Sequence, residues 1–308
     1  MLRFPALAVA ALMSCAAGSA ALAQSPAGGA AEPNVKNGKY IYYAGGCASC
    51  HAAPASGTCD DLKIKDELMP VGGRCLKSDF GTFYVPNITP DKQTGIGGWS
   101  SEDFIKAMTA GTSPKGENYY PAFPYASYQK MQRGDLLDLW AFLQTIAPVS
   151  STVPGHDLSF PYNIRAGLRL WKSLYFDGKV FAPDPSQSEQ VNRGAYLTEG
   201  PGHCGECHTP RTSLGGMIAA KKLSGAPNPA GKGFTPNITP DKTGIGSWSA
   251  KDISYALQSG FTPEGDVMGG EMAKVQQNMS QLTPEDRDAI AAYLKSIPPV
   301  ENARPKKK

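Results

Sequence analysis

Two short segments place cysteine and histidine where they could hold a prosthetic group. The sequences Cys47-Ala48-Ser49-Cys50-His51 and Cys204-Gly205-Glu206-Cys207-His208 share the spacing Cys-x-x-Cys-His. This spacing sets two thiols one helical turn apart, where they can bond the two vinyl groups of a haem, and holds a histidine under the iron. We therefore predict two covalently bound haem c groups. The predicted attachment cysteines and proximal histidines are Cys47, Cys50, Cys204, Cys207, His51 and His208.

Two other sites use paired cysteines, and neither fits this pattern. A thioredoxin-like redox pair is expected in a βαβ context and does not need the adjacent histidine. A zinc site needs further cysteine or histidine ligands in each half. Apart from the motif, the second half offers only His203, and the first half has no further histidine before His156. The pattern therefore favours haem.

The chain is a tandem repeat, which gives both motifs the same surroundings. The segment 86–100 returns as 236–249 without the counterpart of Gln93, and a Val-x-x-Gly-x-Tyr pattern precedes each haem motif. Repeats of this length indicate a duplicated domain. We predict two domains, 34–150 and 189–300, joined by a linker at 151–188 that is rich in Pro, Ser and Gly.

Helical patterns must position these motifs. Each half ends in apolar residues at helical spacing, the first from Leu136 to Leu143 and the second from Ile290 to Ile297. Helix starts are predicted at Ser100, Ser249 and Thr283, where capping residues precede acidic ones. The linker contains one predicted helix, at 165–174. We find no alternating strand pattern, so the predicted fold class is all-α.

Composition limits the class of protein. The chain has 308 residues, a formal net charge of +3, 34 Gly and 26 Pro. The length is typical of about two domains, the charge gives no sign of nucleic-acid binding, and the dispersed apolar residues exclude a polytopic membrane protein. A haem core in each domain would explain the abundance of Gly/Pro-rich loops.

The N-terminus predicts export. Residues 1–23 contain Arg3, then an apolar stretch, then Ala21-Leu22-Ala23, which is typical of a cleaved signal peptide. The stretch is short for a membrane anchor, and lipoprotein processing at Cys15 is a second alternative. We predict a periplasmic protein, with membrane association through a partner left open. Residues 301–308 form a basic tail.

The haem motifs and the repeated Asn-Ile-Thr-Pro-Asp…Gly-Ile-Gly-x-Trp-Ser segment resemble di-haem c-type cytochromes that serve as electron-transfer subunits of bacterial periplasmic dehydrogenases. The resemblance implies two tandem class I cytochrome c-like domains with long Gly/Pro-rich loops. It implies a quinohaemoprotein, flavin or molybdenum dehydrogenase as electron donor, and a cytochrome or terminal oxidase as acceptor. A protein of this kind is not an enzyme on its own.

An electron carrier needs a sixth ligand on each iron, usually methionine. In the second half, Met272 lies where relatives carry this ligand, with Met268 as second choice and Met279 also present. In the first half many relatives read Tyr-Pro-Ala-Met-Pro-Tyr, but this chain has Phe123 in place of that methionine. Relatives with phenylalanine there often carry a methionine a few residues later, which implies Met131. Met108 is interpreted as a core residue.

The remaining cysteines distinguish carrier from enzyme. Cys59 and Cys75 lie in an insert unique to the first half, and in an exported protein we expect them to form a disulfide. The alternative is a thiolate haem ligand, as in thiosulfate-oxidising di-haem cytochromes. An open or thiolate-ligated iron would favour a catalytic di-haem enzyme of thiosulfate dehydrogenase or peroxidase type. A haem-based gas sensor is a third hypothesis.

Haem propionates are anions that need hydrogen-bond donors. The repeats supply indole, amide and guanidinium groups for this role, with the alternative that the tryptophans are only core aromatics. The predicted donors are Asn87, Trp99, Asn237, Trp248 and Arg211, with Lys92 and Lys242 as weaker candidates.

Overall fold

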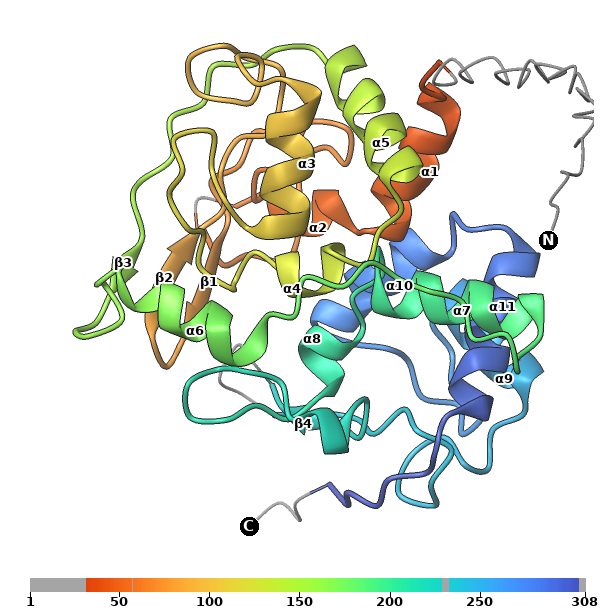
Figure 1. Cartoon of the computed structure of the whole chain (residues 1–308). Helices are drawn as coiled ribbons and strands as arrows, with labels where there is room; N and C mark the ends of the chain where they lie inside the picture. The colour runs from red at the N-terminus through yellow and green to blue at the C-terminus, as the bar shows by residue number, and fades with distance from the viewer. Residues whose placement is uncertain (1–31, 57, 229–232, 305–308) are drawn as a thin grey trace, which may run out of the picture. The chain divides into compact units, whose positions relative to one another are not determined.

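A pair of crossing helices frames each half of the chain (Figure 1). In the computed structural model, which describes residues 32–56, 58–228 and 233–304, α1 (Val35–Ala44) packs on α5 (Arg133–Thr145), and α7 (Glu189–Glu199) packs on α11 (Pro284–Ser296). A Cβ on Gly38 would lie 1.9 Å from the Asp138 carbonyl oxygen, and one on Gly194 would lie 1.9 Å from the Ala289 oxygen. Only glycine therefore allows these helices to approach so closely, and it does so at equivalent places.

The remaining helices include a motif helix and two further helices in each half, together with α6 between the halves and a 3-10 turn in the second half. They are α2 (Cys47–His51), α3 (Ser101–Ala110), α4 (Tyr125–Tyr128), α6 (Gly167–Tyr175), α8 (Gly205–His208), the 3-10 turn η1 (Ala219–Lys221), α9 (Ala250–Ser259) and α10 (Glu271–Met279). Ser100 and Ser249 form capping boxes with Asp103 and Asp252, and Thr283 caps α11. The predicted helix starts are therefore confirmed.

The all-α prediction is wrong. Strands β1 (Cys75–Ser78), β2 (Gly81–Tyr84) and β3 (Asp157–Leu158) form one antiparallel sheet, and β4 (Ala226–Pro227) pairs with β5 (Phe234–Thr235) in a second. Each strand has only two to four residues. A strand this short cannot show a detectable alternation of polar and apolar residues, so sequence periodicity misses it.

The segment between the halves has its own packing. Its β3 pairs with β2, and the predicted helix is present as α6. Lys172 donates to the carbonyls of Ala110 and Gly111 at the end of α3, and the Trp171 indole donates to the Leu214 carbonyl in the second half. These contacts attach α6 to both halves. The segment is therefore an ordered part of the packed structure.

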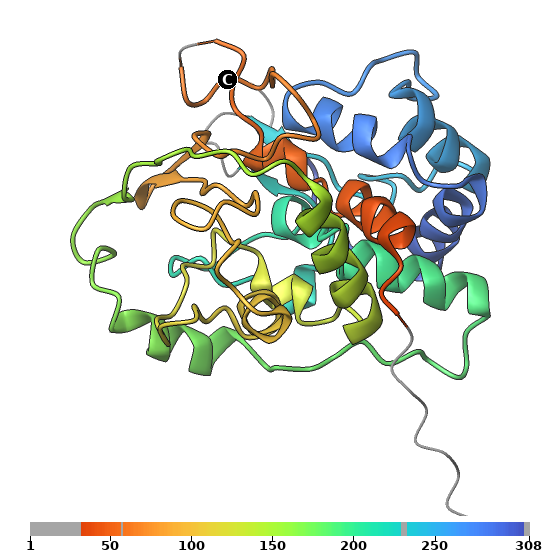
Figure 2. The same ribbon diagram turned by 90° about the horizontal axis from the view of Figure 1, so that it is seen from above.

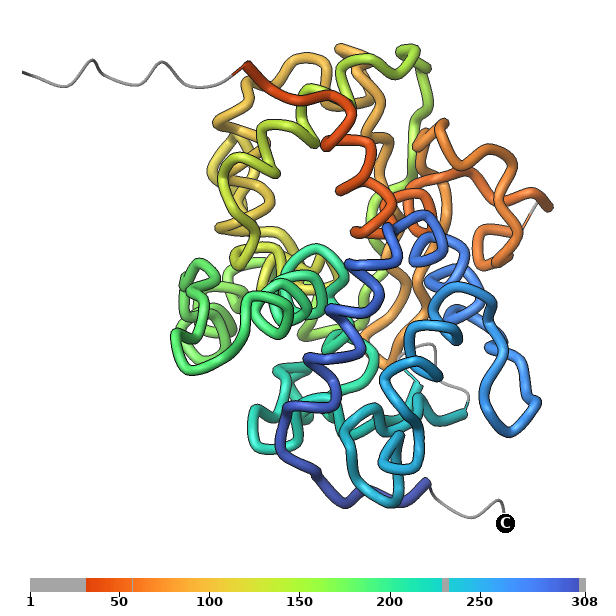
Figure 3. Tube along the Cα trace, turned by 90° about the vertical axis from the view of Figure 1, so that its right-hand side faces the viewer, coloured from red at the N-terminus to blue at the C-terminus, as the bar shows by residue number. Residues whose placement is uncertain are grey.

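The two halves are in direct contact. From Pro33 onward the described residues belong to one compact unit, with one apolar core cluster in each half. Helix α1 contacts both α5 and α10 (Figure 2), and the red-to-yellow and blue halves meet along it in Figure 3. The hydroxyl of Tyr40 donates to Asp286, and the equivalent Tyr196 donates to Asp135. Such reciprocal contacts are those of an isologous interface.

Some predictions lie outside the described residues. These are the signal peptide at 1–23, with the alternative processing site Cys15, and the lysines of the basic tail. Among the helices that the structure describes, none is long and apolar enough to span a bilayer.

Candidate haem sites

Each Cys-x-x-Cys-His motif lies on a short helix directly after the first helix of its half. The thiols of all four motif cysteines are free. Burial raises the pKa of Cys47 to about 12 and that of Cys204 to about 12. Cys47 and Cys204 are therefore neutral thiols that pack against the apolar core of their half, whereas Cys50 is half-buried and Cys207 is exposed.

The motif histidines are fixed by a carbonyl oxygen that the sequence analysis missed. His51 Nδ1 lies 2.8 Å from the Pro86 oxygen, and His208 Nδ1 lies 2.8 Å from the Pro236 oxygen. Because a carbonyl can only accept, Nδ1 is the protonated nitrogen in each ring and Nε2 keeps its lone pair. Nε2 is then the nitrogen available to iron, and the hydrogen bond orients the ring.

The environment keeps both histidines neutral. Burial lowers the pKa of His51 to about 4, although the hydrogen bond to Pro86 opposes this change. The pKa of His208 is lowered for the same reason and is opposed in the same way by Pro236. A neutral imidazole is the form that binds a metal. The donor set in both halves thus fits haem: two thiols and one oriented imidazole.

A glycine completes each histidine support. Gly72 donates its backbone N–H to the His51 carbonyl (2.6 Å), and Gly225 donates to the His208 carbonyl (2.7 Å). Both have positive φ, +78° and +87°, and a Cβ on either would lie within 2.8 Å of the backbone that carries the proline. Both glycines precede the repeated Pro-Asn-Ile-Thr segment, so the repeat could have revealed them.

The repeated asparagines brace the loop that supplies the proline carbonyls. Asn87 Nδ2 donates to Val149 O at 2.8 Å, and Asn237 Nδ2 donates to Val300 O at 2.8 Å. Each also donates to a threonine of the same loop, at 3.1 and 3.0 Å. These amides connect the loop to the chain after the last helix of its half, and their predicted contact with the propionates stays a prediction.

The other predicted propionate donors differ in their contacts. The Trp248 indole donates to Glu264 at 2.9 Å, whereas Trp99 packs half-buried against the first core. Arg211 donates to the backbone oxygens of Gly215 (2.7 Å) and Glu206 (2.9 Å), and pairs with the Glu206 carboxylate. Arg211 is thus placed beside the haem motif helix α8.

The structure places the predicted sixth ligands in different settings. Met131 is 2% exposed and belongs to the first core cluster, together with Ala48 of the haem motif. Met272 lies half-buried in the first turn of α10 and packs against the second cluster. Met268 precedes α10 and Met279 lies buried at its end. Met108 is a buried core residue, and axial ligation by Met131 and Met272 stays a prediction.

Cys59 and Cys75 are bonded to each other in a disulfide that spans 16 positions of the sequence. The bond joins the start of the insert to β1. Both sulfurs are therefore engaged, and neither is a thiolate available to iron.

The two haem motifs lie close together. His203, the residue before the second motif, has its Nε2 3.2 Å from the carbonyl oxygen of Gly45, which lies just before the first motif. Glu206 within the second motif accepts a hydrogen bond from Ser127 of the first half at 2.6 Å. Both motifs therefore lie at the contact between the halves.

Known proteins have sequences similar to this chain. A family model for cytochrome c matches residues 35–147 and 191–298. The chain is 51% identical over 264 residues to a di-haem cytochrome c-type protein of Cereibacter sphaeroides, which covers 86% of each chain. It is 36% identical to the cytochrome c subunit of a quinone alcohol dehydrogenase of Gluconacetobacter polyoxogenes, over 94% of this chain but 61% of that one. It is 35% identical to the fructose dehydrogenase cytochrome subunit of Gluconobacter japonicus, over 86% of this chain and 53% of that one.

The geometry and these similarities agree. Two motif helices present thiols and oriented imidazoles, and both lie within the ranges that the family model matches. The protein carries two covalently bound haem c groups and is an electron-transfer cytochrome. The chain therefore belongs to the cytochrome c family.

Proposed function

We propose that this protein is a periplasmic carrier that accepts single electrons from a dehydrogenase and delivers them to a cytochrome or a terminal oxidase. The proximity of the two haem motifs carries the proposal: His203 and Gly45, which lie just before the two motifs, are 3.2 Å apart at Nε2 and the carbonyl oxygen, so an electron received at one site can pass to the other without leaving the chain. The relatives described above include cytochrome subunits of dehydrogenases for different substrates. The partner class is inferred from these names.

Each bound haem supplies a one-electron iron couple. The protein's own residues hold it and set its surroundings. The motif cysteines anchor the ring, the Pro86 and Pro236 carbonyls orient the proximal imidazoles, and we propose Met131 and Met272 as the sixth ligands. A neutral imidazole with a thioether ligand favours a relatively high potential, and full coordination excludes substrates from iron.

The disulfide argues against the catalytic alternative in which a cysteine thiolate binds iron. That alternative required Cys59 or Cys75 as an iron ligand, and the two sulfurs are bonded to each other. A catalytic role would now need an iron without a sixth ligand. We therefore propose that the chain does not act as an enzyme on its own.

Ligand substitution tests the proposal. Reduced wild-type protein should show two low-spin haems, and Met131→Ala and Met272→Ala should each convert one haem to the high-spin form. Met268→Ala and Met108→Ala serve as matched controls and should leave both spectra unchanged. A wild-type haem that is high-spin at neutral pH would contradict the carrier proposal.

A test of the direction of electron transfer requires the partner protein. Affinity purification of the protein from its host, followed by anaerobic addition of candidate substrates, should yield a dehydrogenase that reduces both haems. Reduction of the haems by a substrate in the absence of any copurified subunit would instead indicate an enzyme.

A further inference from the structure

The contacts between the halves concentrate on two segments, and these are the segments that carry the proposed sixth ligands. In the first half, residues 127–132 surround Met131. In the second half, α10 carries Met272 and leads to the start of α11. Each segment is held by residues of the opposite half, close to the opposite haem motif.

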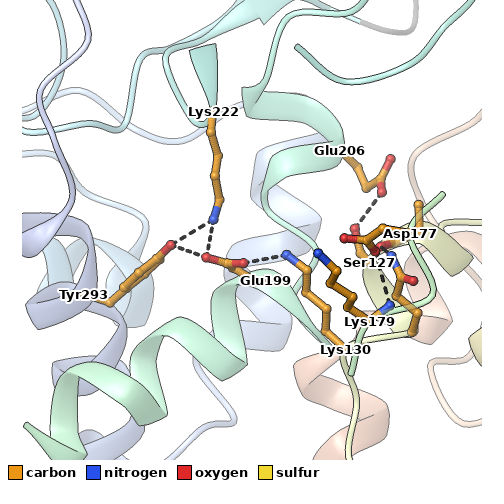
Figure 4. A network of polar contacts seen from close by, with 10 residues as sticks. Ser127, Lys130, Asp177, Lys179, Glu199, Glu206, Lys222 and Tyr293 are labelled. Carbon is orange, nitrogen blue, oxygen red and sulfur yellow. Dashed lines mark hydrogen bonds and ion pairs between the residues drawn. The ribbon is translucent and has the colours of Figure 1, made fainter. Parts of the chain in front are cut away.

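The Met131 segment is held by the second half at three points. Ser127 Oγ donates to Glu206 within the second haem motif (2.6 Å), Lys130 Nζ pairs with Glu199 (2.5 Å), and the backbone N–H of Gln132 donates to the Tyr196 hydroxyl (3.2 Å). Figure 4 shows the first two contacts. Ser127 and Lys130 precede Met131 along the chain and Gln132 follows it, so the three contacts lie on both sides of Met131.

Glu199 is the centre of the stronger contact. Its carboxylate is 15% exposed and is contacted by Lys130, Lys222 and the Tyr293 hydroxyl (Figure 4). Burial opposes ionisation, but the two lysines outweigh it and lower the pKa of Glu199 to about 2. The carboxylate is therefore charged at neutral pH, and Lys222 and Tyr293 fix it within the second half. It offers Lys130 a fixed anion rather than a mobile one.

The α10 segment is held by the first half in a corresponding way. Asn278 Nδ2 donates to Ser49 Oγ in the first haem motif (2.9 Å), and the backbone N–H of Thr283 donates to the Tyr40 hydroxyl (3.2 Å). Glu271, the residue before Met272, pairs with Arg74 at 2.6 Å. Arg74 is 2% exposed and also donates to the Ser49 carbonyl. It therefore joins the ligand segment of one half to the haem motif of the other.

We propose that each half of the molecule positions the sixth ligand of the other half's haem, with Glu199 and Tyr196 holding the Met131 segment and Arg74 and Tyr40 holding the Met272 segment. These four are positioning residues, since none of them is proposed to touch iron. The inference rests on the proposed ligation by Met131 and Met272. It makes the stability of each iron–methionine bond a property of the interface.

The structure supplies a crossed test. Tyr40→Phe and Tyr196→Phe remove one hydroxyl each, at equivalent positions on α1 and α7, and leave the ring packing intact. Tyr196→Phe should loosen the ligand of the first haem only, and Tyr40→Phe that of the second haem only. Glu199→Gln and Arg74→Gln should cause larger changes of the same kind, because each removes the less exposed partner of an ion pair between the halves.

The experiment observes the iron-bound methionines directly. Proton NMR of the reduced protein resolves the methyl group of each iron-bound methionine, and Met131→Ala and Met272→Ala assign the two signals. We expect the crossed signal to broaden, and the rate of carbon monoxide binding at that haem to rise about tenfold in the ion-pair variants. Arg133→Gln is the matched control: Arg133 lies two residues from Met131, but its ion pair with Glu102 is exposed and stays within the first half.

Three outcomes would overturn the inference. Loosening of the ligand in the same half as the substitution would contradict the crossed arrangement. Unchanged methionine signals in all four variants, with unchanged thermal unfolding, would show that the contacts do not position the ligands. Absence of two methionine signals in the wild type would overturn the proposed ligation as well, so the failures of the two proposals are distinguishable.

Discussion

The two halves of the molecule share one side of the haem site and differ on the other. The proximal side is the same in both: a histidine on a proline carbonyl, a glycine with positive φ behind it, and an asparagine that braces the loop. The segments that carry the proposed sixth ligands differ: Met131 follows the four-residue helix α4, whereas Met272 lies within the nine-residue helix α10. The two copies thus share the contacts that support the motif histidine and differ in the segment proposed to supply the sixth ligand.

The largest expected effect concerns the helix crossing that both halves share. Gly38→Ala and Gly194→Ala should each destabilise the fold by about 3 kcal/mol, because a Cβ there overlaps a backbone carbonyl. Urea unfolding measures the loss. Gly134→Ala in α5 is the control, since its Cβ would meet no atom within 4 Å and should be neutral or slightly stabilising. If only one of the two substitutions lowered the free energy of unfolding, the two helix crossings would not be equivalent.

Removal of the disulfide tests a feature of one half. The double variant Cys59→Ser, Cys75→Ser should lose about 3 kcal/mol, since the bond closes a loop of 16 positions. Hydrogen exchange should increase in β1 and β2 and stay unchanged in β4 and β5. Equal changes in both sheets would mean that the insert supports the whole molecule rather than the first half.

Acid should weaken the Glu199 contact. The folded pKa of Glu199, about 2, lies below the ordinary value of 4.5, so its stabilisation is present above about pH 4.5 and is lost as the pH falls toward 2. At pH 7 the Glu199→Gln variant should therefore be less stable than the wild type by about 3 kcal/mol. This gap should narrow between pH 4.5 and pH 2. A gap that is independent of pH would show that packing, not charge, is lost.

The smallest effect concerns the braced loops. Asn87→Ala and Asn237→Ala should each cost about 2 kcal/mol, because the substitution leaves the backbone N–H of the buried Thr89 or Thr239 without its acceptor. Gln93→Ala, at the exposed position that the second copy lacks, should change the stability by less than about 0.5 kcal/mol. Equal decreases in the free energy of unfolding for the two variants would support the equivalence of the two proximal sides. Unequal decreases would contradict that equivalence.

The proximal side was largely predictable, because its chemistry is local in sequence. The Cys-x-x-Cys-His motifs and the repeat indicate haem and duplication directly, and the helix starts follow from the capping residues. The carbonyl partners of His51 and His208 lie 35 and 28 residues away, so spacing alone could not reveal them. The residue type of Asn87 and Asn237 does not tell which acceptors their amides meet, so their contacts with the Val149 and Val300 carbonyls were not predictable.

The contacts between the halves could not be predicted. Arg74 meets Glu271 across 197 positions, and Tyr40 meets Asp286 across 246. No local pattern encodes such pairs. The short strands were missed for a different reason, since β3 to β5 have only two residues each. These parts of the molecule depend on tertiary packing.

The central claim is that both irons are fully coordinated, as in an electron carrier. The most direct measurement is the stoichiometry of carbon monoxide binding to the purified, fully reduced protein at neutral pH. We predict two low-spin haems per chain, each accepting one electron, and no stoichiometric binding of carbon monoxide. Binding of one equivalent per chain to the wild type would contradict the claim and indicate an open iron.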